Sequence, residues 1–340
     1  MSKVVTFGEI MLRLAPEGYY RFFQSDRMQA TFGGAEANVS VSLANYGVDS
    51  VFVTKVPSQA IGQAAVDALR SFGVDTSKIV RGGDRLGIYY MEKGAGPRGS
   101  LCIYDRAYSS VSMAQPSEYD WDDIFEGADW FHFTGITPAL SDACAKACVD
   151  ACEAAKKRGI KISCDLNYRS KLWSRERAGE VMSELAKYID VCIANEEDAK
   201  DVFGIEADNS DINSGILDKE GYKSVAKKLA DKFGFEKVAI TLRKSISASE
   251  NDWSAMLMSD GEYYFSKEYH LNIVDRVGGG DSFGGGLIYA MLSGMSSQET
   301  IEFAVAASAL KQSIEGDFNR VSVQEVLKLA GGNSSGRVQR

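Results

Sequence analysis

Segments typical of β-strands alternate with segments typical of α-helices along most of this chain. Short runs of apolar and β-branched residues are each followed by a longer amphipathic stretch, and several of these stretches end at a glycine. The strands are predicted at 4–14, 51–56, 130–134, 160–165, 191–194 and 237–242, and the helices at 35–46, 61–72, 141–158, 175–188 and 220–233. Parallel strands need a crossover between them, usually a helix. The alternation therefore predicts an α/β fold, a doubly wound and mostly parallel sheet flanked by helices.

Two stretches interrupt this alternation. The segment 19–32 is polar and aromatic without a helical period, and the segment 86–108 predicts two strands around a glycine-rich turn. Together they are expected to form a small sheet outside the main one. Such an appendage serves either as a lid over a site or as a contact between copies of the chain. The second use is favoured by the exposed strand edges, which tend to pair with another strand.

We therefore expect one domain over residues 1–330, with lid segments inserted at about 15–33 and 85–110. The glycine- and serine-containing segment 331–340 is predicted to be a flexible tail.

Charge and hydropathy exclude several classes of partner. The chain has 38 Lys and Arg against 47 Asp and Glu, a formal net charge of −9. Binding to nucleic acid or to an anionic membrane needs an excess of basic residues, so neither partner is expected. No apolar run reaches the roughly 18 residues of a membrane span, and the first residues lack the pattern of a signal peptide. We expect a cytoplasmic protein.

The cysteine pattern argues against a structural zinc site. The six cysteines include no C-x-x-C pair, and only two histidines are available as partners. Cys144, Cys148 and Cys152 recur every four residues, which places them on one face of a predicted helix, where thiolates could gather. We interpret them instead as small apolar residues that pack in a reducing compartment.

A glycine run near the C-terminus predicts an anion site. Gly278, Gly279 and Gly280 precede an amphipathic helix, and the N–H groups of a first helical turn are free to bind a phosphate. Asp281 lies in that first turn. An acidic residue there is also favourable by itself, typically by about 0.3–1 kcal/mol, so a simple helix-start role is the alternative.

The same residues contain a G-x-S-x-G pattern at 280–284, which is typical of the nucleophile elbow of serine hydrolases. The triad order of α/β-hydrolases requires a histidine after the serine, but His132 and His270 both precede Ser282. The hydrolase interpretation is therefore disfavoured. Because no Gly-Lys-Ser/Thr occurs, phosphoryl transfer would not use a Walker A loop.

Two motifs together resemble the PfkB (ribokinase-like) family of sugar kinases: GGAEAN at 33–38, after the first strand, and DRVGGGDSF at 275–283. The resemblance spans almost the whole chain. It implies ATP and Mg²⁺ as cofactors and a sugar site that contains Gly33, Gly34 and Asn38. It also implies that Gly278, Gly279 and Gly280 form the anion hole and that Asp281 contacts the substrate as catalytic base. The family commonly has alanine where Gly279 stands, a change that keeps the backbone donors.

Within that family, RLGIYY at 85–90, YDR at 104–106 and DLNYR at 165–169 resemble the 2-dehydro-3-deoxygluconate (KDG) kinases. A sugar acid needs cationic donors for its carboxylate as well as partners for its hydroxyls. The resemblance implies substrate contacts from Tyr90, Tyr104, Arg106, Arg169 and Asp317. Taken singly, each arginine could instead form a surface ion pair.

The resemblance also points to a nucleotide side. The segment from Asn195 to Asp198 lies where the family has N-x-x-E, with Asp198 in the place of the family's glutamate. The resemblance implies that Asp198, or Glu197, acts on the metal through water. The alternative is an acidic helix start that Asn195 caps. Nucleotide contacts are expected from Asn195, Thr241, Arg243, Gly278, Gly280 and Ser308. Arg243 replaces the glycine of the family's Thr-x-Gly.

The sequence thus predicts ATP-dependent phosphorylation of KDG at its 6-hydroxyl, giving 2-dehydro-3-deoxy-6-phosphogluconate, by a homodimer or larger homo-oligomer joined through the lid. The alternatives are another sugar kinase of the family, such as a fructokinase or a 5-dehydro-2-deoxygluconate kinase, and a sugar-sensing regulatory protein. A monomer whose lid folds back on its own sheet is the alternative to the oligomer.

Overall fold

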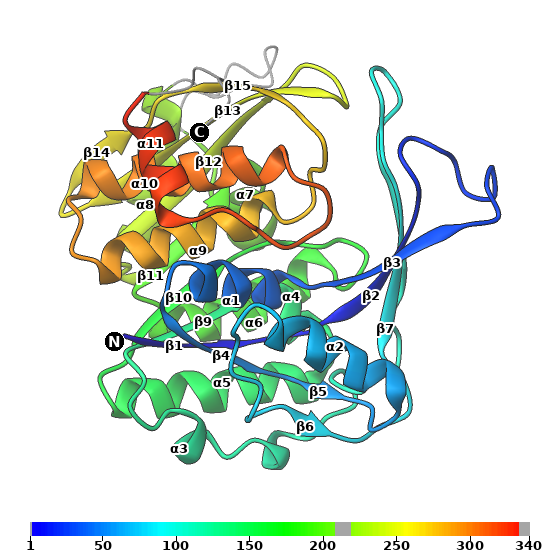
Figure 1. Ribbon diagram of the computed structural model, residues 1–340. Coiled ribbons are helices and arrows are strands. Elements are labelled where there is room, and N and C mark those ends of the chain that lie inside the picture. Colours follow the sequence, from blue (N-terminus) through cyan, green and yellow to red (C-terminus); the bar gives the residue numbers. More distant parts are fainter. Residues whose placement is uncertain (1, 208–218, 333–340) are drawn as a thin grey trace.

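A nine-stranded, mostly parallel sheet forms the centre of the molecule (Figure 1). The structure is a computed structural model that describes residues 2–207 and 219–332. In spatial order the strands are β14 (Glu262–Phe265), β13 (Glu250–Ser259), β12 (Lys237–Ser245), β11 (Val191–Asn195), β10 (Lys161–Asp165), β9 (Trp130–Thr134), β1 (Lys3–Phe7) and β4 (Asp49–Val53), with β15 (Tyr269–Asn272) beside β13. From β12 to β4 all neighbours are parallel, whereas β13 pairs antiparallel with β12, β14 and β15.

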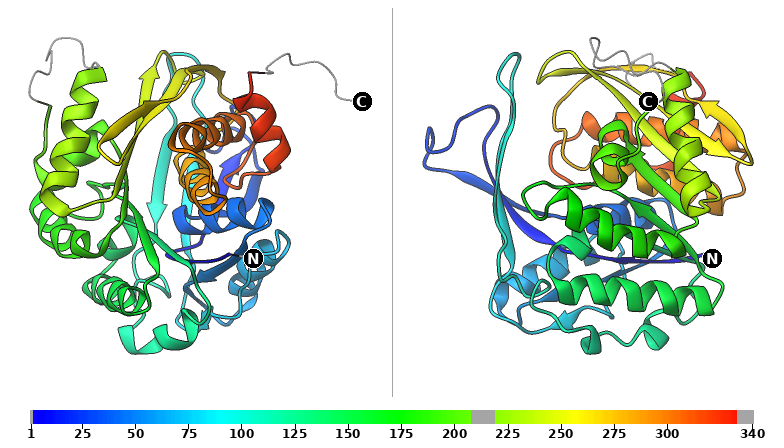
Figure 2. Two further views of the ribbon diagram at one scale, coloured as in Figure 1. Left: turned by 90° about the vertical axis from the view of Figure 1, so that its left-hand side faces the viewer. Right: turned by 180° about the vertical axis from the view of Figure 1, so that it is seen from behind.

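Helices cover both faces of this sheet (Figure 2, left). One face packs against α5 (Asp142–Lys157), α6 (Arg175–Leu185), α7 (Glu196–Phe203) and α8 (Lys219–Phe233), and the other against α1 (Ala35–Asn45), α9 (Gly279–Leu292) and α10 (Ser297–Gln312). Successive strand residues point to opposite faces, so Val5 packs with the first group and Val4 with the second. The doubly wound α/β prediction is confirmed.

Shorter elements complete the fold. They are α2 (Ala60–Arg70), α3 (Trp121–Ile124), α4 (Ile136–Ala139), α11 (Val323–Ala330), the 3₁₀ turns Pro116–Glu118 and Ala186–Tyr188, and the two-stranded ribbon of β5 (Lys55–Val56) and β6 (Val80–Arg81). Among the helices that the structure describes, none combines the length and the apolar character needed to cross a membrane.

A separate four-stranded sheet projects from the body (Figures 1 and 2). We call it the small sheet; its order is β3 (Met28–Gly33), β2 (Met11–Pro16), β7 (Gly87–Glu92) and β8 (Leu101–Asp105). The two predicted strands of the 86–108 segment are β7 and β8, so the expected sheet outside the main one is confirmed. Its second strand, β2, was predicted as part of a strand of the main sheet.

Two predicted strands are wrong in extent. The strand expected at 4–14 divides into β1 and β2, because the chain leaves the main sheet at Gly8, where a side chain would collide with Glu36: a Cβ would lie 2.0 Å from its Oε2. The strand expected at 51–56 divides into β4 and β5. The three antiparallel strands β13, β14 and β15, which extend the main sheet beyond β12, were not predicted.

Cys144, Cys148 and Cys152 lie on the inward face of α5 and are buried in the core. All three are free thiols, and burial raises the pKa of each. The interpretation of these cysteines as packing residues is confirmed.

Candidate active site

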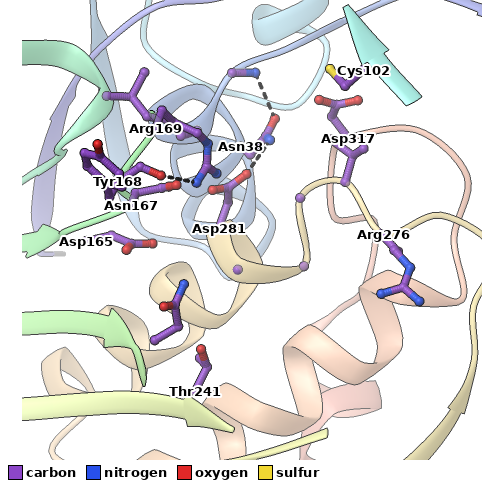
Figure 3. A pocket seen from close by; sticks show the side chains of 18 of the residues that line it. Asn38, Cys102, Asp165, Asn167, Tyr168, Arg169, Thr241, Arg276, Asp281 and Asp317 are labelled. Carbon is purple, nitrogen blue, oxygen red and sulfur yellow. Dashed lines mark hydrogen bonds between the residues drawn. The ribbon is translucent and has the colours of Figure 1, made fainter. Parts of the chain in front are cut away.

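A cavity of about 520 Å³ opens between the small sheet and the carboxyl ends of the parallel strands (Figure 3). Asp165 and Asn195, the last residues of β10 and β11, line it together with Tyr104 and Arg106 of the small sheet. In open α/β sheets this edge is where ligands bind, because the loops that follow the strands converge there.

The glycine run forms the floor of the cavity. Helix α9 begins at Gly279, and its N-cap Gly278 has a left-handed φ of 81°. A Cβ at Gly278 would lie 2.1 Å from the carbonyl oxygen of Asp317, so only glycine fits. The N–H of Gly279 donates to the carbonyl of Arg276 at 3.3 Å, whereas those of Gly278 and Gly280 make no hydrogen bond within the described part of the chain. Two backbone donors of the predicted three are therefore open to a phosphate.

Asp281 and Asn38 connect the two sequence motifs. Asn38 donates its side-chain amide to Asp281 Oδ2 at 2.6 Å and accepts from the backbone N–H of Gly34 at 3.3 Å (Figure 3). No side chain caps α9, but Asp281 lies in its first turn, so the helix-start role is compatible with the structure. The bond from Asn38 places the same carboxylate at the cavity as well. Burial raises the pKa of Asp281 to about 6, while the bond from Asn38 acts in the opposite direction.

Glu36 is a second buried carboxylate at this cavity. Burial raises its pKa to about 7. Its Oε1 accepts from the Thr134 N–H and hydroxyl, at 2.9 and 2.8 Å, and from the Thr137 hydroxyl at 2.6 Å. Because these donors hold Glu36 against the end of β9, Asp281 is the carboxylate better placed to act on a ligand beside the glycine turn.

Asn195, Glu197 and Asp198 all line the cavity. Asn195 caps α7, accepting from the N–H groups of Glu197 and Asp198, both at 2.8 Å. Asp198 in turn accepts from the N–H of Asn195 at 3.2 Å and of Tyr168 at 3.0 Å. The capped acidic helix start is therefore confirmed, and it brings carboxylates to the cavity as well.

These carboxylates lie in an unfavourable environment for negative charge. Burial raises the pKa of Asp165 and Asp198, and the neighbouring charges of Asp198 and Asp281 raise that of Asp165 further. A cation bound among them would relieve this cost. The described residues contain no group of three or more His, Cys, Asp or Glu side chains arranged to hold a metal.

The small sheet and the β10–α6 loop supply cations to the cavity. The guanidinium of Arg106 donates from Nε to Glu9 Oε2 at 2.8 Å and lies 5.4 Å from the ring centre of Tyr104. Its ion pair is buried rather than at the surface. Arg169 donates to the Tyr168 carbonyl at 2.9 Å and pairs with no carboxylate among the described residues.

The prediction that Tyr90 lines the site is wrong. Tyr90 points away from the cavity and contacts the ring of Phe22, whereas its neighbour Tyr89 lines the cavity and donates to Asp317 Oδ2 at 2.5 Å. Adjacent residues of a strand face opposite sides of the sheet, so only one tyrosine of the pair can reach the ligand.

Sequence reasoning missed Arg13. This buried residue of β2 donates to Asp275 Oδ2 at 2.7 Å and to Asp317 Oδ1 at 2.8 Å. The two bonds join the small sheet to the segment before the glycine turn and to the loop that follows α10. A lone arginine in an otherwise apolar strand is the signal in the sequence that could have identified it.

Gly33, predicted to contact the substrate, does not line the cavity. Its lack of a side chain leaves room for Asp317, whose Oδ2 would lie 2.0 Å from a Cβ at this position.

The residues predicted to contact a nucleotide line the cavity, with the exception of Ser308. Thr241 and Arg243 of β12 line the cavity, as does Arg276. Ser308 does not: it is buried in α10, and its hydroxyl donates to the carbonyl of Gly279 at 2.7 Å. Its side chain is used to hold α9 against α10, which corrects its predicted nucleotide contact.

Comparison with known proteins finds matches over almost the whole chain. The family described as pfkB family carbohydrate kinase matches residues 1–319. A 2-dehydro-3-deoxygalactonokinase from Haloferax volcanii is 32% identical over 337 residues, 98% of each chain. The crystal structure of a 2-dehydro-3-deoxygluconokinase from Thermotoga maritima is 50% identical with a TM-score of 0.94, covering 98% of this chain and 100% of that chain. A putative ribokinase II from E. coli, solved with ATP and Mg²⁺, shares the fold at 20% identity and a TM-score of 0.80, over 97% of this chain and 99% of that chain.

Proposed function

Because this chain belongs to the pfkB family of carbohydrate kinases, we propose that it transfers the γ-phosphoryl group of ATP to the 6-hydroxyl of KDG. The observation that carries the proposal is the pairing of Asp281 with Asn38 beside an open glycine turn, in one cavity with Arg106 and Arg169. The turn suits a phosphoryl group and the arginines suit a carboxylate. The Thermotoga maritima relative, named for the same substrate, supports it.

In the proposed reaction Asp281 accepts the proton of the 6-hydroxyl as that oxygen attacks the γ-phosphorus. The new O–P bond forms while the bond between the γ-phosphorus and the bridging oxygen breaks, and ADP leaves with that oxygen. The N–H groups of Gly278 and Gly280 donate to the phosphoryl oxygens, where negative charge is concentrated. Asn38 keeps the carboxylate of Asp281 oriented toward the sugar.

Mg²⁺ fits the donors at the other side of the cavity. When bound, it neutralises charge on the β- and γ-phosphates. Asp198 and Glu197, acting through water, are the carboxylates proposed to hold it, and Thr241, Arg243 and Asn195 are proposed to contact the nucleotide.

The small sheet is proposed to serve as the lid of a single domain and as a dimer contact. Its edge strand β8 exposes Leu101 and Ile103, and the adjoining segment exposes Tyr108 and Met113. An edge strand with exposed apolar side chains is a template for pairing. A second copy of this chain, placed with two-fold symmetry, would cover the same patch on both partners.

A panel assay tests the substrate. ATP consumption is measured with KDG, its galactonate epimer, 5-dehydro-2-deoxygluconate and fructose. We expect the highest kcat/KM with KDG. The galactonate epimer is the second candidate, because a relative covering 98% of the chain bears that name. Preference for fructose would leave the arginines without an anion and contradict the proposal, and turnover of no sugar would favour a sensing protein.

A further inference from the structure

The tip of the β7–β8 hairpin contacts the turn between β12 and β13 on the nucleotide side of the molecule (Figure 1). The N–H of Ala248 donates to the carbonyl of Gly96 at 2.8 Å, and the N–H of Gly96 donates to the hydroxyl of Ser249 at 2.9 Å. The backbone of the hairpin tip is thus paired in both directions with a turn that lies far from it in the sequence.

Arg276 contacts the turn between β12 and β13 through its side chain. Its guanidinium donates to the carbonyl of Ser247 at 2.5 Å and to that of Ala248 at 3.3 Å. Arg276 stands two residues before Gly278, and it lines both the active-site cavity and a second cavity under the hairpin tip. A continuous set of contacts therefore runs from the glycine turn through Arg276 and Ala248 to Gly96.

The charge around Arg276 is unbalanced. Arg276 and Arg243 both line the active-site cavity, and neither forms an ion pair with a carboxylate in the described part of the chain. Burial, together with the positive charge of Arg243, lowers the pKa of Arg276. A polyphosphate bound between two guanidinium groups would remove their mutual repulsion, since planar guanidinium groups pair well with phosphate.

We infer that Arg276 is a positioning residue that fastens the small sheet to the nucleotide side, so that nucleotide and sugar acid bind cooperatively. The inference rests on the proposed function. Phosphates that neutralise Arg243 and Arg276 stabilise the turn, and the turn holds the hairpin tip. The same hairpin carries Tyr104 and Arg106, which face the sugar side of the cavity. By linkage, each ligand then tightens the binding of the other by the same factor.

Calorimetric titration of the full chain tests the inference. The Kd of KDG is measured without nucleotide and with a saturating, non-hydrolysable ATP analogue and Mg²⁺. Couplings between sites typically amount to about 5- to 150-fold, and we expect about tenfold tighter KDG binding here. Arg276→Lys keeps the charge but cannot donate to two carbonyls as a fork, so it should retain the affinity for KDG alone and bring the ratio close to one.

Ser249→Ala should reduce the same ratio, because it removes the acceptor for Gly96. Lys244→Gln is the matched control: it removes a cation from the same β12–β13 hairpin but does not line the cavity, so the ratio should stay as in the wild type. Unchanged ratios in both Arg276→Lys and Ser249→Ala would overturn the inference, as would a wild-type ratio of one.

Hydrogen exchange separates this inference from the substrate assignment. Binding of the analogue alone should slow exchange of the amides at 94–100 and 246–249 in the wild type, and not in Arg276→Lys. If KDG fails to bind while this protection still appears, the proposed substrate is wrong and the role of Arg276 stands. If KDG binds and the analogue leaves exchange unchanged, the role of Arg276 is refuted.

Discussion

Asn38 donates its side-chain amide to Asp281 at 2.6 Å across 243 residues of sequence. The bond joins the start of α1 to the start of α9, two helices that pack on the same face of the main sheet. It therefore sets the orientation of the proposed base relative to the glycine turn, and it favours the charged form of the carboxyl group that burial disfavours.

Replacing Asp281 by asparagine keeps the size of the side chain and removes the base. We expect kcat to fall by about 10²- to 10⁴-fold, with little change in nucleotide affinity. Steady-state kinetics and nucleotide titration measure both. Asp260→Asn, at an exposed turn, is the control and should behave as the wild type. If Asp281→Asn turned over at the wild-type rate, Asp281 would not be the catalytic base.

The pH profile should report the same group. Asp281 must be deprotonated to act, and its pKa is raised to about 6, so kcat/KM should fall as the pH drops below about 6. Asn38→Ala removes a donor that favours the charged form, and the acid limb should then move to higher pH. A limb that stays in place or moves to lower pH in Asn38→Ala would contradict this assignment.

Arg169 offers the cleaner test of carboxylate recognition. Arg106 is paired with buried Glu9, so its loss would leave a buried charge uncompensated, whereas Arg169 donates only to the neighbouring Tyr168 carbonyl among the described residues. Arg169→Gln should raise the KM for KDG by about tenfold or more, leave weak activity on neutral sugars unchanged, and keep the Tm. Arg106→Ala should also raise the KM for KDG, with a lower Tm. Equal losses on acid and neutral substrates would show that Arg169 is structural.

The small sheet should join two copies of the chain. Light scattering of the purified protein at micromolar concentration should give the mass of a dimer or a larger assembly. Ile103→Glu places a charge on the exposed edge strand β8 and should shift the mass toward the monomer. Glu262→Gln, on β14 at an edge of the main sheet and therefore outside the small sheet, is the control. A wild-type monomer that is fully active would rule out the contact.

Much of the fold could be predicted because its signals are local. Strand β9 was predicted with its observed bounds, and α5 to within one residue at each end, because Ser141 caps the helix and Gly159 follows it. The site motifs were likewise local, since the glycine run must open a helix. These features depend on neighbouring residues, which the sequence displays directly.

The remainder depends on contacts between distant residues. The division of 4–14 into two strands follows from the packing of Gly8 against Glu36, and nothing in the strand pattern marks it. The choice of Tyr89 over Tyr90 depends on which face of the small sheet meets Asp317. The bonds from Arg13 to Asp275 and Asp317 span 262 and 304 residues. Such contacts are set by tertiary structure and leave no local pattern.

Phosphorus NMR of the product is the most direct test of the proposed reaction. The purified protein is incubated with ATP, Mg²⁺ and KDG, and the coupling of the new phosphate monoester to the sugar protons locates it. We predict ADP and 2-dehydro-3-deoxy-6-phosphogluconate in equal amounts, with almost no product from Asp281→Asn in the same time. A phosphate on any other oxygen, or hydrolysis of ATP without a sugar phosphate, would contradict the proposal.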